Sequence, residues 1–357
     1  MLKILNKYLL KKFFIASLSS LILIVMIFSI FSFLEELTNN YDFPSIIKYL
    51  INSLPVTANM VQSLAILVGS IFVTASLISN SELQIFISAG ISLKQFIKTT
   101  LIYTFSISVI FLIIGESFSP YFFEKAESIK AYAQGKFYSN SNSNIWLKRD
   151  RKFINIEKSL GNKNFEDVTI FEFDSTNKLK NIQFGNKAFL DSELLKIEDP
   201  IYVVIDNQEK FIKLKSLKNQ INSDVVTLNQ NQINSLSKDL RSMGLFELFK
   251  SLYFFKDNGI ETDKVTSELF NRLLKPFNLL GMFLIAIPFV ISFKRNKSIN
   301  KMIFLGIIVA ITFNLVNKVM AIVSLKFGLN IYITSILPTL VTLTIGLVLL
   351  KKKLESL

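Results

Sequence analysis

Six apolar stretches in this sequence are each long enough to cross a lipid bilayer, and they constrain the fold more than any other feature. They cover residues 13–34, 54–78, 97–115, 274–293, 302–323 and 331–350. A bilayer core of about 30 Å requires about 20 helical residues at a rise of about 1.5 Å each. Half of the 357 residues are hydrophobic. We therefore predict an α-helical polytopic membrane protein with six transmembrane helices.

The lysines and arginines of the short loops predict how these helices are oriented. Such residues precede the first span, separate the second from the third and the fourth from the fifth, and follow the sixth. Basic loops stay on the cytoplasmic side of a membrane, so both termini are expected there and residues 116–270 outside. The net charge of +13 then reflects topology and anionic lipid. No nucleic-acid-binding motif accompanies it, and nucleic acid is not an expected partner.

The residues predicted to lie outside the membrane change to short alternating apolar runs. Alternation bounded by turn-forming residues is typical of strands with one buried face. It occurs in residues 152–157, 168–173, 178–184, 201–206 and 211–216. Residues 116–241 are therefore predicted to form an inserted all-β domain, β-jellyroll-like or a related sandwich or open barrel. Four residues are expected to form its core or else to line its interior, with the core favoured: Phe171, Phe173, Ile182 and Phe184.

A helical connector is predicted over residues 242–270. Apolar residues recur at helical spacing in 242–259, with Ser242 as the expected N-cap. The helix is expected either to lie against the outer membrane surface or to pack as an ordinary helix. The connector separates two membrane halves, residues 1–115 and 271–357.

The polar break between the second and third spans, SNSELQIFISAGIS (79–92), predicts a short cytoplasmic helix over about 80–91. Ser81 followed by Gln84 fits a capping box. Glu82 lies in the first turn, where the helix dipole favours an anion. Gly90 can adopt the left-handed conformation that ends a helix.

An apolar ridge on this short helix has two interpretations. Leu83, Phe86 and Ile87 share one face at helical spacing. The segment is either an interfacial hairpin between two spans or a docking helix for a soluble partner. In the second case Glu82 would pair with a basic residue of that partner.

The fifth span carries polar residues, which are costly inside a bilayer and mark candidate functional sites. Asn314, Asn317 and Lys318 form one stripe at helical spacing. Lys318 either binds a lipid phosphate as a compact charge or extends to the outer interface. An intramembrane Ser/Lys hydrolase using Lys318 and Ser324 is a competing hypothesis. Six positions apart, however, these two side chains lie on different faces of a helix.

Missing residue types limit the chemistry further. The sequence has no Cys and no His, which removes thiol nucleophiles, disulfides, His general bases and the usual zinc sites. No GxxxxGK[ST] motif occurs, so hydrolysis of ATP by a P-loop of this chain is not expected. We predict no catalytic residue, metal site or bound cofactor, and any uphill transport has to be powered by a partner.

Several stretches, in this order, resemble the lipopolysaccharide-export permease family LptF/LptG. They are MLKILNKYLLKKFF at the start, NSELQIFISAGIS, GESFSP (115–120), WLKRDRKFINIEK (146–158) and ELFNRLLKPFNLLGMFLIAIPF (268–289). The resemblance covers nearly the whole chain, and residues 146–158 are closer to LptG than to LptF. It implies a permease subunit of an ABC transporter in the bacterial inner membrane, with a periplasmic β-jellyroll between the third and fourth spans.

The resemblance also implies partners. The substrate would be lipopolysaccharide, and the partners a companion permease LptF, the LptC protein and a cytoplasmic LptB dimer that binds ATP and Mg. The short helix matches the coupling helix that docks into LptB. Its contact residues would be Glu82, Leu83, Phe86, Ile87 and Gly90.

Two basic residues beyond the third span are further candidates. Lys130 matches a basic position on the path of the lipid headgroup, and Lys125 lies on the same segment; a solvated helix face is the alternative. Glu35 and Glu36 follow the first span, where members of the family carry lysines. They would repel a phosphate unless a divalent cation bridges them. This departure from the family indicates a less phosphorylated lipid A or reliance on the partner permease. An ABC-type membrane protein that transmits force to a periplasmic partner without carrying lipid is the alternative function.

Overall fold

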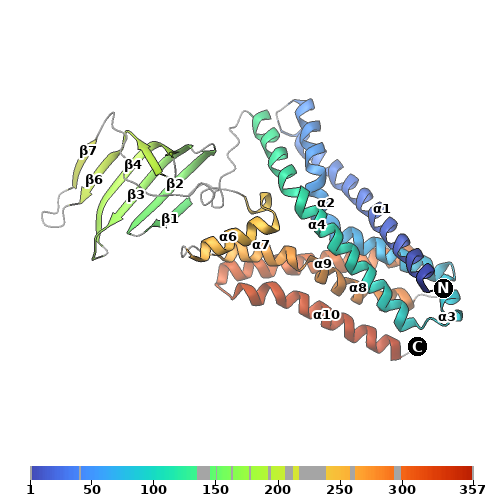
Figure 1. Cartoon of the computed structure of the whole chain (residues 1–357). Coiled ribbons are helices and arrows are strands. Elements are labelled where there is room, and N and C mark those ends of the chain that lie inside the picture. The colour runs from blue at the N-terminus through green and yellow to red at the C-terminus, as the bar shows by residue number, and fades with distance from the viewer. Residues whose placement is uncertain are drawn as a thin grey trace. The chain divides into compact units, whose positions relative to one another are not determined.

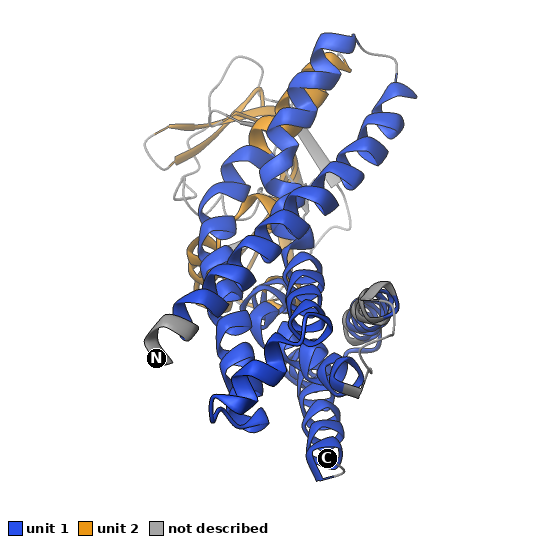
Figure 2. Cartoon of the chain, turned by 90° about the vertical axis from the view of Figure 1, so that its right-hand side faces the viewer, with its two compact units in different colours: residues 1–123, 266–357 blue, residues 124–265 orange. Residues whose placement is uncertain are grey.

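The chain forms two compact units (Figure 2). Unit 1 combines Met1–Phe123 with Thr266–Leu357, and unit 2 is Glu124–Val265. The computed structural model describes residues 2–39, 42–134, 145–149, 151–161, 164–176, 178–191, 194–205, 212–216, 239–257, 262–292 and 299–355.

Helices make up most of the described chain (Figure 1). They are α1 (Leu2–Leu37), α2 (Phe43–Ser79), α3 (Glu82–Ser88), α4 (Leu93–Ala133), α6 (Leu245–Asp257), α7 (Asp263–Leu273), α8 (Lys275–Ser292), α9 (Ile299–Phe327) and α10 (Ile331–Glu355), with a 3-10 turn, η1, at Leu240–Ser242. In unit 1 the N-terminus, α3 and the C-terminus lie at one end of the helices (Figure 1).

Four of these helices, α1, α2, α4 and α10, are long and apolar enough to cross a membrane. Helices α7 and α8, bent by 52° at their junction, pass the same test together as one further span. Helix α9 contributes a shorter apolar stretch, Ile307–Met320. The described residues thus give four spans, or five with the bent pair, where the sequence predicts six.

Two helices extend well beyond the apolar runs that predicted them. Helix α4, expected over 97–115, continues to Ala133, and α2, expected from 54, begins at Phe43. The start of α2 is capped by Asp42, whose side chain accepts a hydrogen bond from the backbone N of Ser45 (3.2 Å). Apolar length shows where a helix must cross lipid, but capping residues outside the bilayer decide where it ends.

The core of unit 1 is built on a close crossing of α1 and α2. A Cβ atom added to Gly69 of α2 would lie 2.8 Å from the backbone N and Cα of Ser17 on α1. The missing side chain lets the two backbones approach, as small residues do in membrane helix pairs. Phe13, Ile66 and Ile71 are fully buried nearby.

Unit 2 contains a single antiparallel sheet in which most neighbours in space are neighbours in sequence. Its strands are β1 (Ile145–Arg149), β2 (Lys152–Gly161), β3 (Asn164–Phe173), β4 (Leu179–Asp191), β5 (Leu194–Glu198), β6 (Ile201–Ile205) and β7 (Ile212–Ser216). The order is β1-β2-β3-β4-β6-β7, with β5 paired to β4. All five predicted strands are present. The alternating runs did not predict β1 and β5, which are five residues each.

The sheet has two apolar faces, and the sequence assigned the wrong one to the core. The fully buried face carries Ile154, Ile156, Val168 and Ile170. The expected core residues Phe171, Phe173, Ile182 and Phe184 are half-buried on the opposite face, where Phe171 stacks on Trp146 (5.7 Å between ring centroids). Alternation separates two faces but does not say which one is covered.

The connector helix begins later than predicted. Ser242 belongs to η1, where its hydroxyl donates to the carbonyl of Asp239 (2.8 Å), and α6 starts at Leu245. Ser242 is therefore not the N-cap of α6. The spacing of Leu245, Leu248, Phe249 and Leu252 predicts one apolar face for this helix. The buried residues of α6 are instead Leu248, Ser251 and Phe255, and Phe249 is exposed.

We expect Gly69→Val to destabilise unit 1, because the new side chain would overlap the backbone of α1. Overpacking of this kind costs about 1–3 kcal/mol of unfolding free energy. Thermal unfolding of the purified protein in detergent measures the effect. Ile51→Val, at an exposed position on the same helix, is the control. Equal stability of Gly69→Val and Ile51→Val would contradict the close crossing.

Candidate functional site

A polar cavity of about 400 Å³ lies among α2, the α7–α8 junction and α9 in unit 1. Its polar lining is Ser63, Asn271, Lys275, Asn278, Asn314, Asn317 and Lys318. The predicted stripe of Asn314, Asn317 and Lys318 thus faces one space. Because Asn271, Lys275 and Asn278 come from another segment, spacing along α9 gave no sign of them.

The cavity has an excess of positive charge. Lys275 and Lys318 are its two charged lining residues, and each asparagine adds amide donors. Lys318 is exposed and makes no ion pair with any residue that the structure describes. Such a cavity suits an anionic group that is large enough to contact both lysines.

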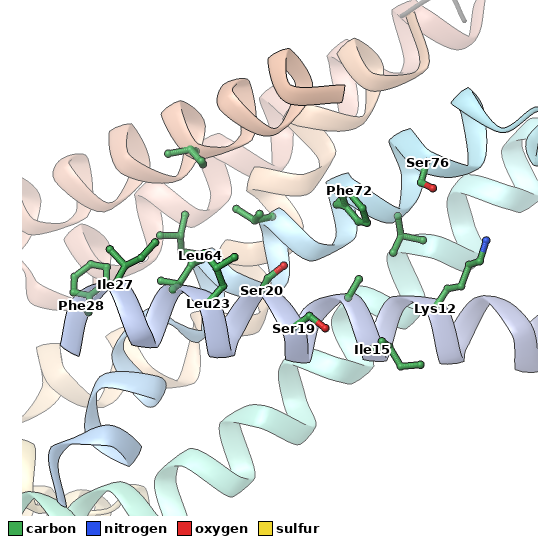
Figure 3. Close-up of a pocket in the computed structure, with 15 residues that line it drawn as sticks. Lys12, Ile15, Ser19, Ser20, Leu23, Ile27, Phe28, Leu64, Phe72 and Ser76 are labelled. Atoms are coloured by element: carbon green, nitrogen blue, oxygen red, sulfur yellow. The ribbon is translucent and has the colours of Figure 1, made fainter. Parts of the chain in front are cut away.

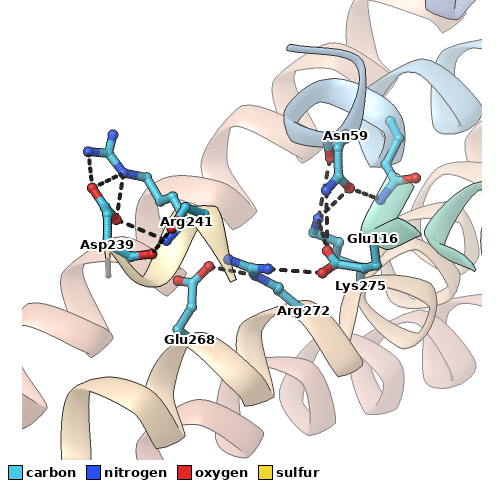
Figure 4. A network of polar contacts seen from close by, with 9 residues as sticks. Asn59, Glu116, Asp239, Arg241, Glu268, Arg272 and Lys275 are labelled. Atoms are coloured by element: carbon cyan, nitrogen blue, oxygen red, sulfur yellow. Dashed lines mark hydrogen bonds and ion pairs between the residues drawn. The ribbon is translucent and has the colours of Figure 1, made fainter. Parts of the chain in front are cut away.

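A buried ion cluster borders the cavity and joins α4 to the α7–α8 junction (Figure 4). Arg272 on α7 donates from Nη1 to Oε2 of Glu116 on α4 (2.9 Å) and from Nε to Oε1 of Glu268 (2.7 Å). The side chains of Arg272 and Glu116 are only 8% and 6% exposed. A buried charge without a partner is very unfavourable, so this pair fixes where α7 meets α4.

Lys275 connects the ion cluster to the cavity. Its Nζ donates to Oδ1 (3.0 Å) and to the backbone O (3.3 Å) of Asn59 on α2, and lies 3.8 Å from Oε1 of Glu116. Asn59 in turn donates to Glu116 (3.2 Å) and accepts from Gln62 (2.9 Å). Spacing along the sequence did not predict this cluster. The signal was a carboxylate in GESFSP and an arginine in NRLLKP, both at the ends of apolar spans.

An apolar groove of about 710 Å³ runs along α1 and α2 (Figure 3). Leu23, Ile27 and Phe28 of α1 and Phe72 of α2 line it, with Ile307 of α9. Lys12 lies at one end of the groove (Figure 3). Leu64 of α2 lines both this groove and the polar cavity, so the two spaces are neighbours.

The short helix α3 is tied to α1, which corrects the prediction for Glu82. Oε1 and Oε2 of Glu82 accept hydrogen bonds from Lys12 Nζ (2.7 and 2.9 Å), and Oε2 accepts one from Tyr8 (2.8 Å). Glu82 therefore pairs with a lysine of its own chain, Lys12, which lies 70 residues earlier in the sequence. Burial acts to raise the pKa of Glu82, but these hydrogen bonds and the Lys12 charge hold it below its ordinary value of 4.5.

The apolar ridge of α3 also points differently from the prediction. Leu83 is 8% exposed in the core of unit 1, and Phe86 packs against it beside Phe96. The exposed apolar residues are Ile85 (64%) and Ile87 (48%). Seven residues make fewer than two turns, so the segment before α3, and not the spacing, decides which residues face inward.

The ends of α3 differ in how well they were predicted. Gly90 has a φ of +89° with open space around its Cα, in the left-handed conformation expected of it. Ser81 is itself left-handed (φ 61°), and its side chain makes no capping hydrogen bond, so the capping box with Gln84 is wrong. A left-handed residue cannot direct its hydroxyl to the first turn as an N-cap does.

None of the remaining predicted residues is among those that line the polar cavity. Lys125 and Lys130 are on the last part of α4, in unit 2, and their role stays a prediction. Glu36 is buried and accepts a hydrogen bond from Asn39 (2.8 Å), whereas Glu35 is exposed at the end of α1. Burial of one carboxylate leaves Glu35 as the more accessible charge there.

We expect Arg272→Met to lower the unfolding free energy by about 3–5 kcal/mol, because Glu116 would lose its closest cation while staying buried. Thermal unfolding in detergent measures this loss. Lys264→Met, at an exposed position on the same helix, is the control. The double variant Arg272→Met/Glu116→Met should be more stable than Arg272→Met, since the more deeply buried of the two carboxylates that Arg272 pairs with is then absent. A double variant that is less stable would contradict the pairing.

We expect Glu82→Gln to loosen α3, because a neutral amide cannot replace the ion pair with Lys12. Hydrogen exchange of the backbone amides of residues 82–89 should be faster in this variant at neutral pH. In the parent protein the contribution of Glu82 is complete above pH 4.5, since its pKa is lowered, and it is lost as the pH falls below that value. Equal exchange in Glu82→Gln and the parent at neutral pH would disprove the interaction.

Comparison with known proteins agrees with this organisation. The family described as lipopolysaccharide export system permease LptF/LptG matches residues 5–352. The chain is 19% identical to the lipopolysaccharide export system permease protein LptG of Escherichia coli (strain K12), over 98% of both chains. It is 22% identical to LptG of Haemophilus influenzae, over 99% of both chains. With its apolar helices and separate sheet, the chain belongs to the LptF/LptG family of lipopolysaccharide export permeases and is closer to LptG.

Proposed function

We propose that this protein is a permease subunit of an ABC transporter that extracts lipopolysaccharide from the outer leaflet of the inner membrane. It would pass the lipid to a periplasmic bridge towards the outer membrane, powered by a separate ATPase. One observation carries the proposal: the apolar groove and the cationic cavity meet at Leu64. A ligand that fills both has to be apolar at one end and anionic at the other.

The groove supplies the apolar part of this site. Its lining from Leu23, Ile27, Phe28 and Phe72 is apolar along α1 and α2. Each methylene group that leaves water for such a surface contributes about 0.8 kcal/mol. A lipid in a bilayer gains less, because its chains are already in an apolar medium, so the groove selects by shape and by the headgroup beside it.

The polar cavity would bind the anionic part of the ligand. It lies at the end of the helices that suits the headgroup of an outer-leaflet lipid. Met60 and Ser63 lie near the middle of α2, while Lys275 opens α8 and Lys318 is in the second half of α9. With the basic loops and both termini in the cytoplasm, these positions face the periplasmic side. Asn314, Asn317 and Lys318 would contact the headgroup, and Lys125 and Lys130 would contact it beyond the bilayer.

Helix α3 would link this site to ATP hydrolysis in the cytoplasm. Its exposed Ile85 and Ile87, with Gly90 behind them, form the surface that would dock into the LptB dimer, which binds ATP and Mg. Lys12 pairs with Glu82 of α3 and also lines the apolar groove. A movement of α3 would therefore act directly on the wall of the groove.

The sheet of unit 2 would receive the lipid in the periplasm. Its half-buried aromatic face, with Phe153, Phe171 and Phe173, is a surface for acyl chains. A jellyroll-like closure of the sheet would shield this face from water. The companion permease LptF would complete a pair of six-span membrane subunits. The LptC protein would continue the bridge towards the outer membrane.

Photo-crosslinking tests this function directly. We expect a crosslinker at Asn317 to capture lipopolysaccharide in the assembled transporter, and the adduct to decrease during ATP turnover. The control position is Val348 on α10, which is exposed and lines neither the apolar groove nor the polar cavity. Adduct at Asn317 no stronger than at Val348, with the ATPase still bound, would favour the force-transmitting alternative.

A further inference from the structure

Lys275 belongs to both the ion cluster and the polar cavity, which distinguishes it from Lys318. We propose that Lys275 senses the lipid headgroup: a phosphate or carboxylate in the cavity takes a hydrogen bond from Lys275 and thereby changes the bend between α7 and α8. This inference rests on the proposed function, because the anion is taken to be the headgroup of the transported lipid.

The hydrogen bonds of Lys275 leave room for a ligand. An ammonium group has three N–H donors. Asn59 accepts two of them, at 3.0 and 3.3 Å, and Glu116 at 3.8 Å is too far for a hydrogen bond. One donor is therefore unused among the residues that the structure describes, on a side chain that lines the cavity.

Glu116 does not depend on Lys275 for its charge balance. Its closest cation is Arg272, at 2.9 Å, with the better geometry of a direct hydrogen bond. When Lys275 turns towards an anion, Glu116 keeps this partner, so the movement leaves no buried charge unpaired. Arg272 is held by two carboxylates and stays in place, which makes Lys275 the movable cation of the cluster.

Lys275 lies next to the bend between α7 and α8, so its movement can change the bend angle. It is the first residue of α8, directly after the 52° bend, and Arg272 lies on α7 just before it. In the unliganded state Lys275 holds the start of α8 to Asn59 of α2. A ligand that draws Lys275 into the cavity weakens this restraint, so that headgroup binding and the bend angle become coupled.

The absence of cysteine from the sequence makes the bend measurable. Spin labels at Lys264→Cys on α7 and Phe289→Cys on α8, both exposed positions, report the distance across the bend by electron paramagnetic resonance. The experiment uses the assembled transporter in lipid nanodiscs, with lipopolysaccharide or with inorganic phosphate. We expect lipopolysaccharide to shift the distance distribution and phosphate alone not to, because free phosphate has no acyl chains in the apolar groove to hold it beside Lys275. A shift with phosphate but not with lipopolysaccharide would overturn the assignment to a lipid headgroup.

Variants of Lys275 separate this inference from the proposed function. Lys275→Gln can still donate to Asn59 but has no charge, and it should lose the shift while the lipid adduct at Asn317 persists. Lys275→Arg should retain the shift, and so should Lys301→Met, which removes an exposed cation from α9. A normal shift in Lys275→Gln would overturn the sensor role alone. If the parent protein forms no lipopolysaccharide adduct at Asn317, the proposed function and the inference are both overturned.

A second variant tests the inference even if Lys275→Gln fails to assemble. Asn59→Ala removes the nearer of the two oxygens that compete for Lys275. The lipopolysaccharide concentration that gives half of the maximal shift should then be about threefold to tenfold lower. This ratio corresponds to the net free energy of one hydrogen bond. A purely structural role for Asn59 predicts unchanged or weaker binding, and that result would count against the inference.

Discussion

The ion pair between Glu116 and Arg272 is the interaction on which the rest of the membrane unit depends. It is almost completely buried and joins residues 156 positions apart, so it fixes α4 against the α7–α8 junction. Water cannot stabilise either charge there, and each needs the other. The cluster therefore places the start of α8, and with it Lys275 and the wall of the polar cavity, relative to α2 and α4.

Close backbone contact is the second constraint on the same unit. Gly69 allows α2 to approach α1, and Gly281 and Gly346 have the same role between α8 and α10, where an added Cβ would lie 2.7 and 2.5 Å from neighbouring side chains. Apolar helices gain little from leaving lipid for one another, so such contacts and the buried charges specify the packing. The groove and the cavity are the spaces that this packing leaves along α1, α2 and α9.

The proposed site has an apolar part and a cationic part, and an ion pair connects the apolar part to α3. A lipid with an anionic headgroup requires an apolar surface beside a cationic one, and Leu64 is where these meet. Lys12 connects α3 to the same groove through Glu82. One ion pair thus lies at the apolar groove and the buried cluster borders the polar cavity through Lys275.

The sequence by itself determined most of the apolar helices and five of the seven described strands, because both follow from local periodicity. It also determined the polar stripe on α9 and the left-handed Gly90, since each depends on residues close in the chain. Only the tertiary structure decided the partners of Glu82, Glu116 and Lys275, and which face of the sheet is buried. These depend on segments far apart in sequence, and the free energy of a buried charge is set by the neighbours that packing brings to it.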